Sequence, residues 1–372
     1  MILGNKVENM DDTKTATKKP VMCCLFGGKS TEYEVSLMSV CSVLNNIDRD
    51  HFDVVTLGVT KDGRWLYFDG DIEAIRGNTW FSDESHARPA MFSPDCGSKQ
   101  LLIFEKNGAV TRLHIDVVFP VMHGANAEDG TMQGLLTICG IPFVGPHHCA
   151  SAIGMDKAYS KLVLANFVIP QANYDVIFRT DSADTAIEKA EAVSGYPLFV
   201  KPANAGSSVG ASKASDREAL KKAIAEALIY DDKAIVEEYI SGREVECAVL
   251  GNDSPIASTP GEIAPNSEFY DYETKYLADT AKDYIPARIS DRSIAAVQSL
   301  AGNIFKILGC RGLSRVDFFV TGAGDTERVI FNEINTLPGF TNISMYPKLF
   351  VHDGISYSAL IDKLAELAME TR

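Results

Sequence analysis

Lys201 to Gly210 is the segment whose residue types most clearly suggest chemistry. It reads Lys-Pro-Ala-Asn-Ala-Gly-Ser-Ser-Val-Gly and lies between two apolar runs, Pro197 to Val200 and Val209 to Ala211. Glycines let backbone N–H groups approach a polyanion, the serine hydroxyls add donors, and the lysine supplies positive charge. The segment is therefore predicted to be a hairpin that grips phosphate, although an ordinary surface hairpin has a similar composition.

Two common phosphate loops do not fit this chain. A Walker loop places its lysine after the glycines and opens a helix, whereas here the lysine comes first and an apolar run follows. Gly27-Gly28 follows the apolar run Val21 to Phe26, as in a dinucleotide-binding turn, but the later glycines of that turn are missing. A nicotinamide cofactor is therefore disfavoured.

Oxygen-bearing side chains gather in two late segments. Glu333-Ile334-Asn335 ends an apolar run, and period-two alternation puts Glu333 and Asn335 on one strand face. Asp317 ends the Ser-Arg-Val-Asp motif in the other segment, so pairing of the two strands would bring three oxygen ligands together. Such ligands suit magnesium better than zinc. We interpret the set as a magnesium site, the alternative being a solvated strand face.

Other polar residues are ambiguous when taken singly. Glu237, Tyr239 and Glu244 flank a strand end, where carboxylates can bind sugar hydroxyls and backbone can pair with an adenine edge, or where they simply form hairpin surface. The Gly339 amide could donate to an oxyanion or belong to a plain Pro-Gly loop. His123 opens the segment to Gly130, which could equally hold a strand-end histidine and acids that complement a helix dipole.

Apolar periodicity divides the chain into three units after a loose tail. We expect a flexible tail over 1–19, an open α/β domain with a mainly parallel sheet over 20–146, a small α+β domain over 147–241 and a last domain over 242–372. Residues 262–286 are polar and aromatic without periodicity, which predicts a functional lid. The predicted helices are 34–46, 129–139, 147–167, 182–193, 216–230, 291–308 and 357–369. The predicted strands are 21–26, 52–60, 115–120, 143–144, 174–178, 234–239, 244–250, 314–320 and 329–335.

Composition is that of a globular protein with room for several cores. The chain has 372 residues, 46% of them hydrophobic and 23% charged. Its formal net charge of -15 argues against broad binding to nucleic acid or anionic membranes. Eight cysteines lie mostly in apolar segments without metal-ligand spacing, as in a reduced protein. With no signal-peptide or membrane-spanning run, we expect a cytoplasmic protein with no nucleic-acid or membrane partner.

Taken together and in order, these segments resemble the ATP-grasp superfamily, and specifically the D-alanine:D-alanine ligases of bacterial cell-wall synthesis. The resemblance runs from Pro20 to the terminal helix. Ala127 stands where that family usually has glycine, so the local turn must accommodate a Cβ. The resemblance implies an ATP-grasp fold with an N-terminal open parallel α/β domain, a small central α+β domain and a C-terminal domain. It is carried by residues 27–36, 123–130, 155–157, 201–210, 270–276, 314–317 and 333–341.

The resemblance implies an ATP-dependent enzyme that forms D-alanyl-D-alanine for peptidoglycan precursors. The carboxylate of the first D-alanine would attack the γ-phosphate, and the amine of the second would displace phosphate from the acyl phosphate. ATP would be held by Lys157, Lys201, Lys275, Glu237, Tyr239, Glu244 and Asn332. Two magnesium ions, for which manganese can substitute, would be held by Asp317, Glu333 and Asn335.

The same resemblance implies the substrate contacts. Glu32 would bind the first ammonium, with His123 nearby, and Arg315 and the Gly339 amide would stabilise the oxyanion. Ser207 and Tyr276 would hydrogen-bond toward Glu32 when the lid closes. Ser344 and Met345 would face the second substrate, and we expect a homodimer.

The second substrate is left open between D-alanine and D-serine. Lys275-Tyr276 argues against D-lactate, and the thioether of Met345 suits a methyl better than a hydroxyl. Residues 28–59 nevertheless also resemble D-alanine:D-serine ligases of the glycopeptide-resistance type. Two further alternatives are a non-catalytic ATP-binding regulator and an ATP-grasp ligase for another amino acid.

Overall fold

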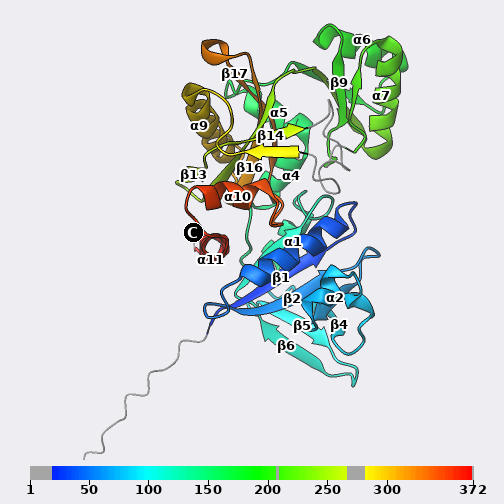
Figure 1. Ribbon diagram of the computed structural model, residues 1–372. Helices are drawn as coiled ribbons and strands as arrows, with labels where there is room; N and C mark the ends of the chain where they lie inside the picture. The colour runs from blue at the N-terminus through cyan, green and yellow to red at the C-terminus, as the bar shows by residue number, and fades with distance from the viewer. Residues whose placement is uncertain (1–18, 207–208, 266–280, 371–372) are drawn as a thin grey trace, which may run out of the picture.

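The computed structural model describes residues 19–206, 209–265 and 281–370. It contains three sheets, drawn in Figure 1 as a blue-to-cyan unit, a green unit and a yellow-to-red unit. Each sheet falls within one of the three predicted ranges. The predicted tail, apart from Lys19, lies outside the described residues.

The N-terminal sheet has the strand order β6-β5-β4-β3-β2-β1-β7. Its strands β1 and β7 are buried along their whole length, which explains why they read as continuous apolar runs. The helices of this unit are α1 (Tyr33–Asn46), α2 (Ile72–Arg76) and α3 (Thr131–Ile138), with a short 3-10 helix at Trp80–Ser82. The strands are β1 (Val21–Gly27), β2 (Asp53–Val59), β3 (Trp65–Phe68), β4 (Ala87–Phe92), β5 (Gln100–Phe104), β6 (Val110–His114) and β7 (Val117–Met122).

The expectation of a mainly parallel sheet holds only for the middle of this unit. Strand β1 pairs in parallel with β2 and β7, whereas β3 to β6 continue the sheet in antiparallel fashion. The short connections from β2 to β3 and from β5 to β6, with glycines Gly63 and Gly108 at positive φ, allow only antiparallel neighbours. Sequence periodicity missed these strands because they are short and partly exposed.

The central unit is a four-stranded sheet of order β10-β9-β11-β8. Helices α6 (Ala183–Val193) and α7 (Arg217–Tyr230) pack their apolar residues against it. The Lys201 segment does form an antiparallel hairpin, although its second strand begins at Ser212 rather than Val209. The strands are β8 (Tyr174–Phe178), β9 (Leu198–Pro202), β10 (Ser212–Ala214) and β11 (Lys233–Glu238).

The helix predicted over 147–167 is in fact two helices, α4 (His148–Met155) and α5 (Lys157–Ala165). The break falls at Asp156, which has an extended backbone with φ -85° and ψ 101°. Its side chain accepts hydrogen bonds from the N–H groups of Ala158 and Tyr159, so it caps the second helix. A capping aspartate inside a helical pattern was the available signal for this break.

The C-terminal sheet follows the order β15-β14-β12-β16-β17, and β13 pairs with β12. The ends of the predicted lid segment form strands β14 and β15, which pair with each other, while residues 266–280 lie outside the described part of the chain. The strands are β12 (Arg243–Gly251), β13 (Ile256–Ala257), β14 (Gly261–Pro265), β15 (Ala281–Tyr284), β16 (Gly312–Thr321) and β17 (Arg328–Asn335). The helices are α9 (Asp291–Ile307), α10 (Met345–His352) and α11 (Tyr357–Met369), with a 3-10 turn at Gly324–Thr326.

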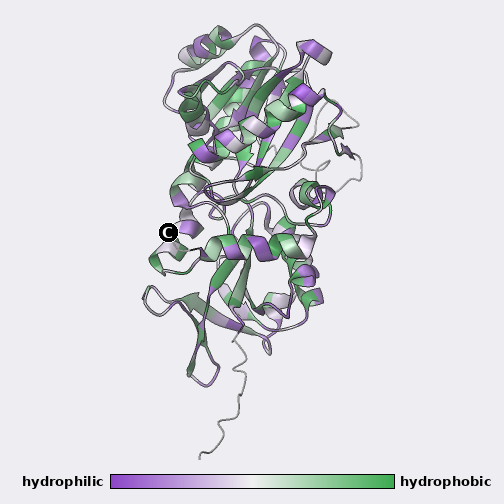
Figure 2. Cartoon of the chain, turned by 90° about the vertical axis from the view of Figure 1, so that its left-hand side faces the viewer, coloured by the Kyte–Doolittle hydropathy of each residue, from purple (hydrophilic) through white to green (hydrophobic). Residues whose placement is uncertain are grey.

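One apolar core joins the first and last units. Helix α11 buries Leu360 and Leu364 against α1 and β7, so the red helix lies on the blue unit in Figure 1. The ring of Phe119 meets that of Phe340 edge-on at 5.5 Å between centroids. This shared core fixes the two units relative to each other. In Figure 2 hydrophobic residues are concentrated on the strands, and the helices carry both hydrophobic and hydrophilic residues.

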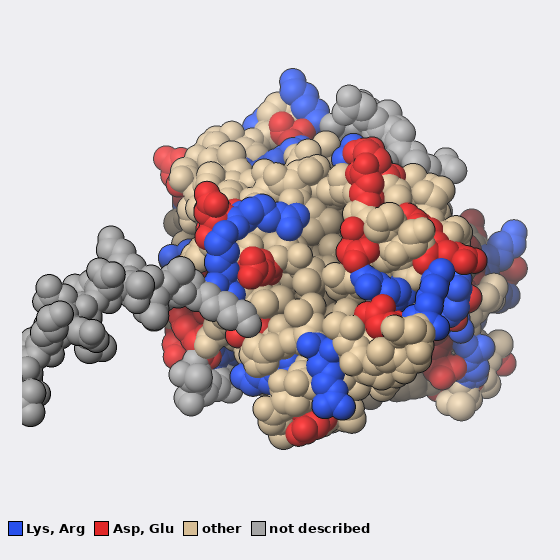
Figure 3. Space-filling view, turned by 90° about the horizontal axis from the view of Figure 1, so that it is seen from below, with Lys and Arg blue, Asp and Glu red and all other residues tan. Residues whose placement is uncertain are grey.

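The surface charges are mixed on the face drawn in Figure 3. Acidic and basic side chains alternate there with uncharged residues instead of forming a patch of one sign. Within the described residues, none of the helices is both long enough and apolar enough to cross a membrane.

Replacement of Leu364 by Ala tests the shared core. Leu364 is fully buried, so the substitution should lower the free energy of unfolding by about 2–5 kcal/mol. The exposed neighbour Lys363 is the matched control, and its replacement by Ala should change stability by no more than about 0.5 kcal/mol. Urea unfolding followed by circular dichroism measures both, and equal losses in the two variants would contradict the core assignment.

Candidate functional site

A cavity of about 160 Å³ lies where the three units meet. Its wall takes residues from every unit. Glu32 and His123 come from the N-terminal unit, Lys157 and Gly206 come from α5 and the loop after β9, and the C-terminal sheet and its following loop supply the rest. That last group includes Glu246, Arg315, Glu333, Asn335, Gly339, Ser344 and Met345.

Glu32 is held at the meeting point of two loops. It lies directly before α1 and is 7% exposed. A Cβ added at Gly124 would lie 2.6 Å from its Oε2, and one added at Gly206 would lie 3.1 Å away. Gly124 also has a positive φ of 73°, so the backbone geometry favours glycine there.

His123 is buried at the end of β7. Its Nδ1 lies 3.3 Å from the Leu337 carbonyl and its Nε2 lies 3.2 Å from the Ser39 hydroxyl. The carbonyl can only accept, which assigns the proton to Nδ1 and leaves Nε2 to accept from the serine. Burial lowers the pKa of His123, and the nearby Glu32 charge only partly opposes this. The imidazole is therefore neutral near pH 7.

Glu128 is one of the acids that the sequence alone left open between a functional role and a complement to a helix dipole. Its Oε1 instead accepts from the Gly124 N–H at 2.9 Å and lies 3.9 Å from Nδ1 of His123. Burial, reinforced by the charge of Glu32, raises the pKa of its carboxyl to about 8. Glu128 is thus predominantly protonated at pH 7.

Strand register places three carboxylates side by side on one face of the C-terminal sheet. Glu246 on β12 faces Asp317 on β16, which in turn faces Glu333 on β17. The next row brings Arg315 opposite Asn335. Strands β16 and β17 therefore pair as predicted, and β12 adds a third strand on the other side of β16.

Arg315 neutralises much of this row. Its guanidinium donates to both oxygens of Asp317 at 2.8 and 2.7 Å, and its Nε lies 3.0 Å from Oε2 of Glu246. Burial opposes its charge, but Asp317 and Glu246 outweigh burial and raise the pKa of Arg315 well above its usual range. The guanidinium is thus fixed and permanently charged at the cavity wall.

The donor set at β16 and β17 fits a magnesium ion that also binds phosphate. Asp317, Glu333 and Asn335 supply oxygens, and the Asn335 amide already touches Asp317 at 2.9 Å. In the described residues no group of three or more His, Cys, Asp or Glu forms a metal site by itself. Magnesium commonly uses one or two protein carboxylates and completes its shell with phosphate oxygens and water, so this set fits.

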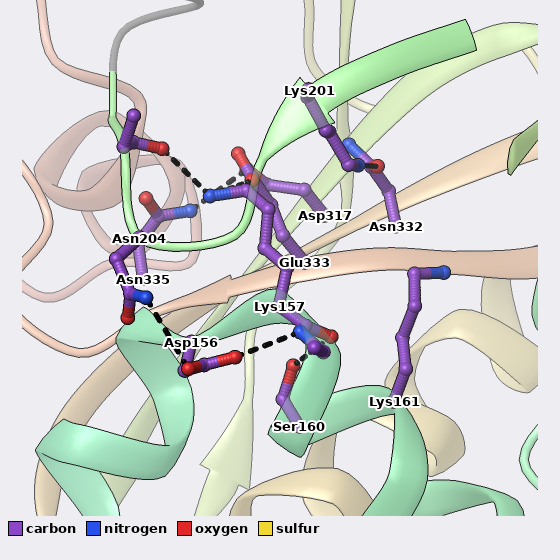
Figure 4. A network of polar contacts seen from close by, with 12 residues as sticks. Asp156, Lys157, Ser160, Lys161, Lys201, Asn204, Asp317, Asn332, Glu333 and Asn335 are labelled. Atoms are coloured by element: carbon purple, nitrogen blue, oxygen red, sulfur yellow. Dashed lines mark hydrogen bonds and ion pairs between the residues drawn. The ribbon is translucent and has the colours of Figure 1, made fainter. Parts of the chain in front are cut away.

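Two lysines approach this row from the central unit (Figure 4). Lys157 lies 3.3 Å from Glu333 and donates to the carbonyl of Ala205 at 2.8 Å. Lys201 donates to Asn332 at 3.1 Å and lies 2.8 Å from Glu237. Phosphate oxygens placed beside the carboxylate row would therefore find two ammonium groups on the opposite side.

Glu237 and Lys161 form a buried pair behind Lys201. Their Oε1 and Nζ atoms are 2.6 Å apart, and Lys161 is fully buried. Burial disfavours a charged Glu237, but Lys161 and Lys201 overcome burial and lower the pKa of its carboxyl to about 2. Glu237 and Glu333 in turn raise the pKa of Lys201 against the effect of its own burial. Glu237 thus keeps Lys201 charged.

Several predicted nucleotide residues do not line the cavity. Lys201, Glu237 and Asn332 form the adjoining cluster described above. The ring of Tyr239 lies under Nζ of Lys213 at 4.2 Å, and Glu244 begins the face of β12 that also carries Glu246. Ser207, Lys275 and Tyr276 lie outside the described residues.

The loop after β17 forms the remaining wall. A Cβ added at Gly339 would lie 2.8 Å from the hydroxyl of Ser344, so the backbone and that side chain are in close approach. The Ser344 hydroxyl also accepts from the Thr341 N–H at 3.0 Å. Met345 opens α10 and is 5% exposed, and Ile263 and Ile343 line the cavity with it. This end of the cavity is the more apolar one.

Comparison with known proteins agrees with this geometry. Residues 21–146 match the family described as D-ala D-ala ligase N-terminus, and residues 163–366 match D-ala D-ala ligase C-terminus. The D-alanine–D-alanine ligase of Acetivibrio thermocellus is 48% identical over 370 residues, covering 95% of this chain and 96% of the relative. That of Caldicellulosiruptor bescii is 49% identical, covering 93% and 94%.

The chain belongs to the D-alanine–D-alanine ligase family. Solved structures of this family share its fold. The VanG D-Ala:D-Ser ligase from Enterococcus faecalis has a TM-score of 0.86 at 40% identity, covering 94% of this chain and 100% of that one. The D-alanine–D-alanine ligase from Coxiella burnetii has a TM-score of 0.81 at 34% identity, covering 94% and 95%. The predicted ATP-grasp fold and ligase class are confirmed, and the ATP-dependent family implies ATP and a divalent metal.

Two residues of the cavity wall and its adjoining cluster were not predicted from the sequence. Glu246 stands two residues after Glu244 on the same strand face, and Lys161 stands one helical turn after Lys157, so periodicity offered a signal for both. Glu128 was considered, but its burial was not foreseen. Ala127 departs from the family pattern without strain, because the positive φ angles of this turn fall on Gly124, Asn126 and Gly130.

Replacement of Glu128 by Gln tests the protonation of this wall. A raised carboxyl pKa means that the native state holds a proton that the unfolded state has lost between about pH 4.5 and 8. The parent should therefore lose stability as pH rises through this window, by at most about 1.4 kcal/mol per pH unit. Glutamine mimics the neutral acid, so the stability of the variant relative to the parent should rise over the same window. Urea titrations at several pH values measure this, with the exposed Glu366→Gln variant as control; parallel curves for Glu128→Gln and the parent would contradict the assignment.

Proposed function

We propose that this chain joins two D-alanine molecules to form D-alanyl-D-alanine, with ATP converted to ADP and phosphate. The observation that carries the proposal is the convergence of Glu32, Arg315, Glu333 and Lys157 on one cavity in a chain of the D-alanine–D-alanine ligase family. These side chains match the charges of an amino acid being phosphorylated.

Glu32 is proposed to bind the ammonium of the first D-alanine. It is a buried carboxylate, and its neighbours His123 and Glu128 are neutral, so neither adds a second negative charge next to the ammonium. The carboxylate of that substrate would then point toward the lysines and the C-terminal sheet. There it attacks the γ-phosphorus, ADP leaves, and an acyl phosphate results.

Lys157 and Lys201 are proposed to hold the phosphates of ATP. Glu237 supports this role because it keeps Lys201 charged within a buried cluster. Tyr239, Glu244 and Asn332 are proposed for the nucleoside side. Asp317, Glu333 and Asn335 would hold two magnesium ions, or manganese in their place, which would neutralise phosphate charge. The roles of Ser207, Lys275 and Tyr276 are predictions on residues outside the described part of the chain.

Arg315 and the Gly339 amide are proposed to stabilise the oxyanion. The amine of the second D-alanine attacks the acyl carbon, phosphate leaves, and the amine gives up a proton. Negative charge develops on the acyl oxygen during this attack, and a fixed guanidinium costs no reorganisation when that happens. Asp317 and Glu246 hold Arg315 in place by three contacts of 3.0 Å or less.

Met345 is proposed to face the methyl group of the second D-alanine. Its thioether, with Ile263 and Ile343, gives an apolar wall near Ser344. A serine hydroxyl placed there would lose water without gaining a partner from Met345. We further propose that the chain acts in the cytoplasm, where ATP is available, and that it forms a homodimer, as the family resemblance implies.

Incubation of the purified chain with ATP, magnesium and D-alanine tests the reaction directly. Phosphate release should require D-alanine, stop when magnesium is chelated, and yield D-alanyl-D-alanine by mass spectrometry. D-Alanine with D-serine should yield mainly the D-alanine dipeptide. A mixed D-alanyl-D-serine product as the main species would instead support the D-serine alternative, and no dipeptide at all would overturn the ligation.

Replacement of Met345 by Asn tests the acceptor wall. The new amide could pair with a serine hydroxyl, so relative kcat/KM should shift toward D-serine by about 1–3 kcal/mol. A competition assay with both amino acids measures the product ratio. Val351→Asn on the same helix is the control, since Val351 is 50% exposed and lies outside the cavity, and its ratio should match the parent. An unchanged ratio in Met345→Asn would remove Met345 from the acceptor site.

A further inference from the structure

Asp156 makes more contacts than its position as a helix cap requires. One oxygen, Oδ1, accepts from the N–H groups of Ala158 and Tyr159 at 3.0 and 3.1 Å, which completes the cap of α5. The residue is 5% exposed, so its second oxygen also needs partners. The cap therefore uses only one of the two carboxylate oxygens of Asp156.

The second oxygen binds two side chains of the central unit. Oδ2 accepts from Nζ of Lys233, at the start of β11. It also accepts from Nδ2 of Asn204, in the loop after β9, at 3.3 Å (Figure 4). Lys233 also lies over the ring of Tyr159, with Nζ 3.9 Å from the centroid. Asn204 is held in turn by Asp231, which accepts from its backbone and side-chain N–H groups at 2.9 Å each.

These contacts lie at a narrow junction. The first turn of α5 packs through Ala158 onto Ala203 and Ile235 of the central unit, a small apolar cluster. The far end of the helix packs through Leu164 into the core of the C-terminal unit. Helix α5 therefore connects the two units that enclose the proposed nucleotide site. Because the apolar junction is small, polar contacts must carry much of its geometry.

We propose that Asp156, Asn204 and Lys233 form a positioning strut that sets where Lys157 and Lys201 stand relative to each other, and so adapts the cleft to a nucleoside di- or triphosphate. The proposal rests on the proposed function, because it takes these two lysines as the phosphate ligands. None of the three strut residues needs to touch the nucleotide.

The backbone shows how the strut reaches the lysines. Lys157 follows Asp156 directly, and its N–H donates to the Ala203 carbonyl at 3.0 Å while its Nζ reaches Ala205 at 2.8 Å. Lys201 lies three residues before Asn204, and the Ala203 N–H donates to the Lys233 carbonyl at 3.0 Å. A shift of Asn204 or Lys233 away from Asp156 would thus move strand β9, which carries Lys201, relative to helix α5, which carries Lys157.

The Asp156→Asn variant removes the contacts of the strut while keeping the helix cap. Asparagine is as good an N-cap as aspartate, so α5 should keep its start. Its Nδ2 would replace the oxygen that now accepts from Lys233 and Asn204, so the strut should be lost. Lys233→Met removes the cation while keeping an apolar stem over Tyr159. The double variant tests whether the two residues act as a unit.

Lys189→Met is the matched control. Lys189 belongs to the same central unit, pairs with Asp181 at 2.9 Å and lies over the ring of Phe178 at 5.6 Å. It therefore loses the same kinds of contact away from the junction. Lys233→Arg is the conservative replacement and should recover most of the parent behaviour.

Calorimetric titration of the full chain with ADP and magnesium is the test, since it requires no amino-acid turnover. Asp156→Asn and Lys233→Met should each weaken ADP binding on the order of ten-fold or more. The double variant should bind ADP no more weakly than the single variant that has the lower ADP affinity. KM for ATP should rise, whereas KM for the first D-alanine at saturating ATP should stay within about two-fold of the parent. Circular dichroism should show folded variants.

ADP affinity in Asp156→Asn and Lys233→Met equal to that of Lys189→Met would overturn the strut, even if thermal stability fell. Additive losses in the double variant would do the same, because they would mean two independent effects. The proposed ligation is judged separately: a parent that binds ADP but makes no dipeptide would contradict the ligation while the binding comparison still decides the strut.

Discussion

The structure depends most on compensation of the carboxylate row that crosses β12, β16 and β17. Strand register forces Glu246, Asp317 and Glu333 together on one face, and uncompensated negative charges at this density would be costly in a buried site. Arg315 compensates them from within the sheet, and Lys157 does so from α5. The same charged groups suit magnesium and phosphate. A bound magnesium nucleotide would replace the ion pairs between these protein side chains with ion pairs to its own metal and phosphate charges.

The three units contribute different electrostatic environments to one cavity. On the N-terminal wall, burial keeps the His123 ring uncharged and holds Glu128 protonated, and both lie beside the carboxyl group of Glu32. The central side is cationic, because Glu237 stabilises the charge of Lys201. The C-terminal side holds the carboxylates and a fixed guanidinium. An ammonium, a phosphate and an oxyanion each therefore find a suitable region within a short distance.

The units are joined in different ways, and this bears on function. A large apolar core that includes helix α11 locks the N-terminal unit to the C-terminal unit. The central unit meets the others through the small cluster around Ala158 and through polar contacts at Asp156. The proposed amino-acid side of the cavity is thus built on the joint with the large apolar core, and the proposed nucleotide side on the joint whose geometry relies on charged groups.

The sequence by itself determined the elements with strong periodicity and the ligand chemistry. Buried strands such as β1 and β16, the long helices, and the ordered motifs that carry the family resemblance are local patterns, so they could be read directly. It did not reveal the short antiparallel strands β3 to β6, the break at Asp156, or the roles of Glu128, Glu246 and Lys161. The break at Asp156 had a local signal in the capping aspartate, but the strands and the roles of the three side chains depend on burial and on which strands become neighbours, and neither is a local property. The residue type of an acid does not reveal whether its side chain is solvated, protonated or paired with arginine. Only the tertiary structure decides among these states, because they are set by groups distant in the chain.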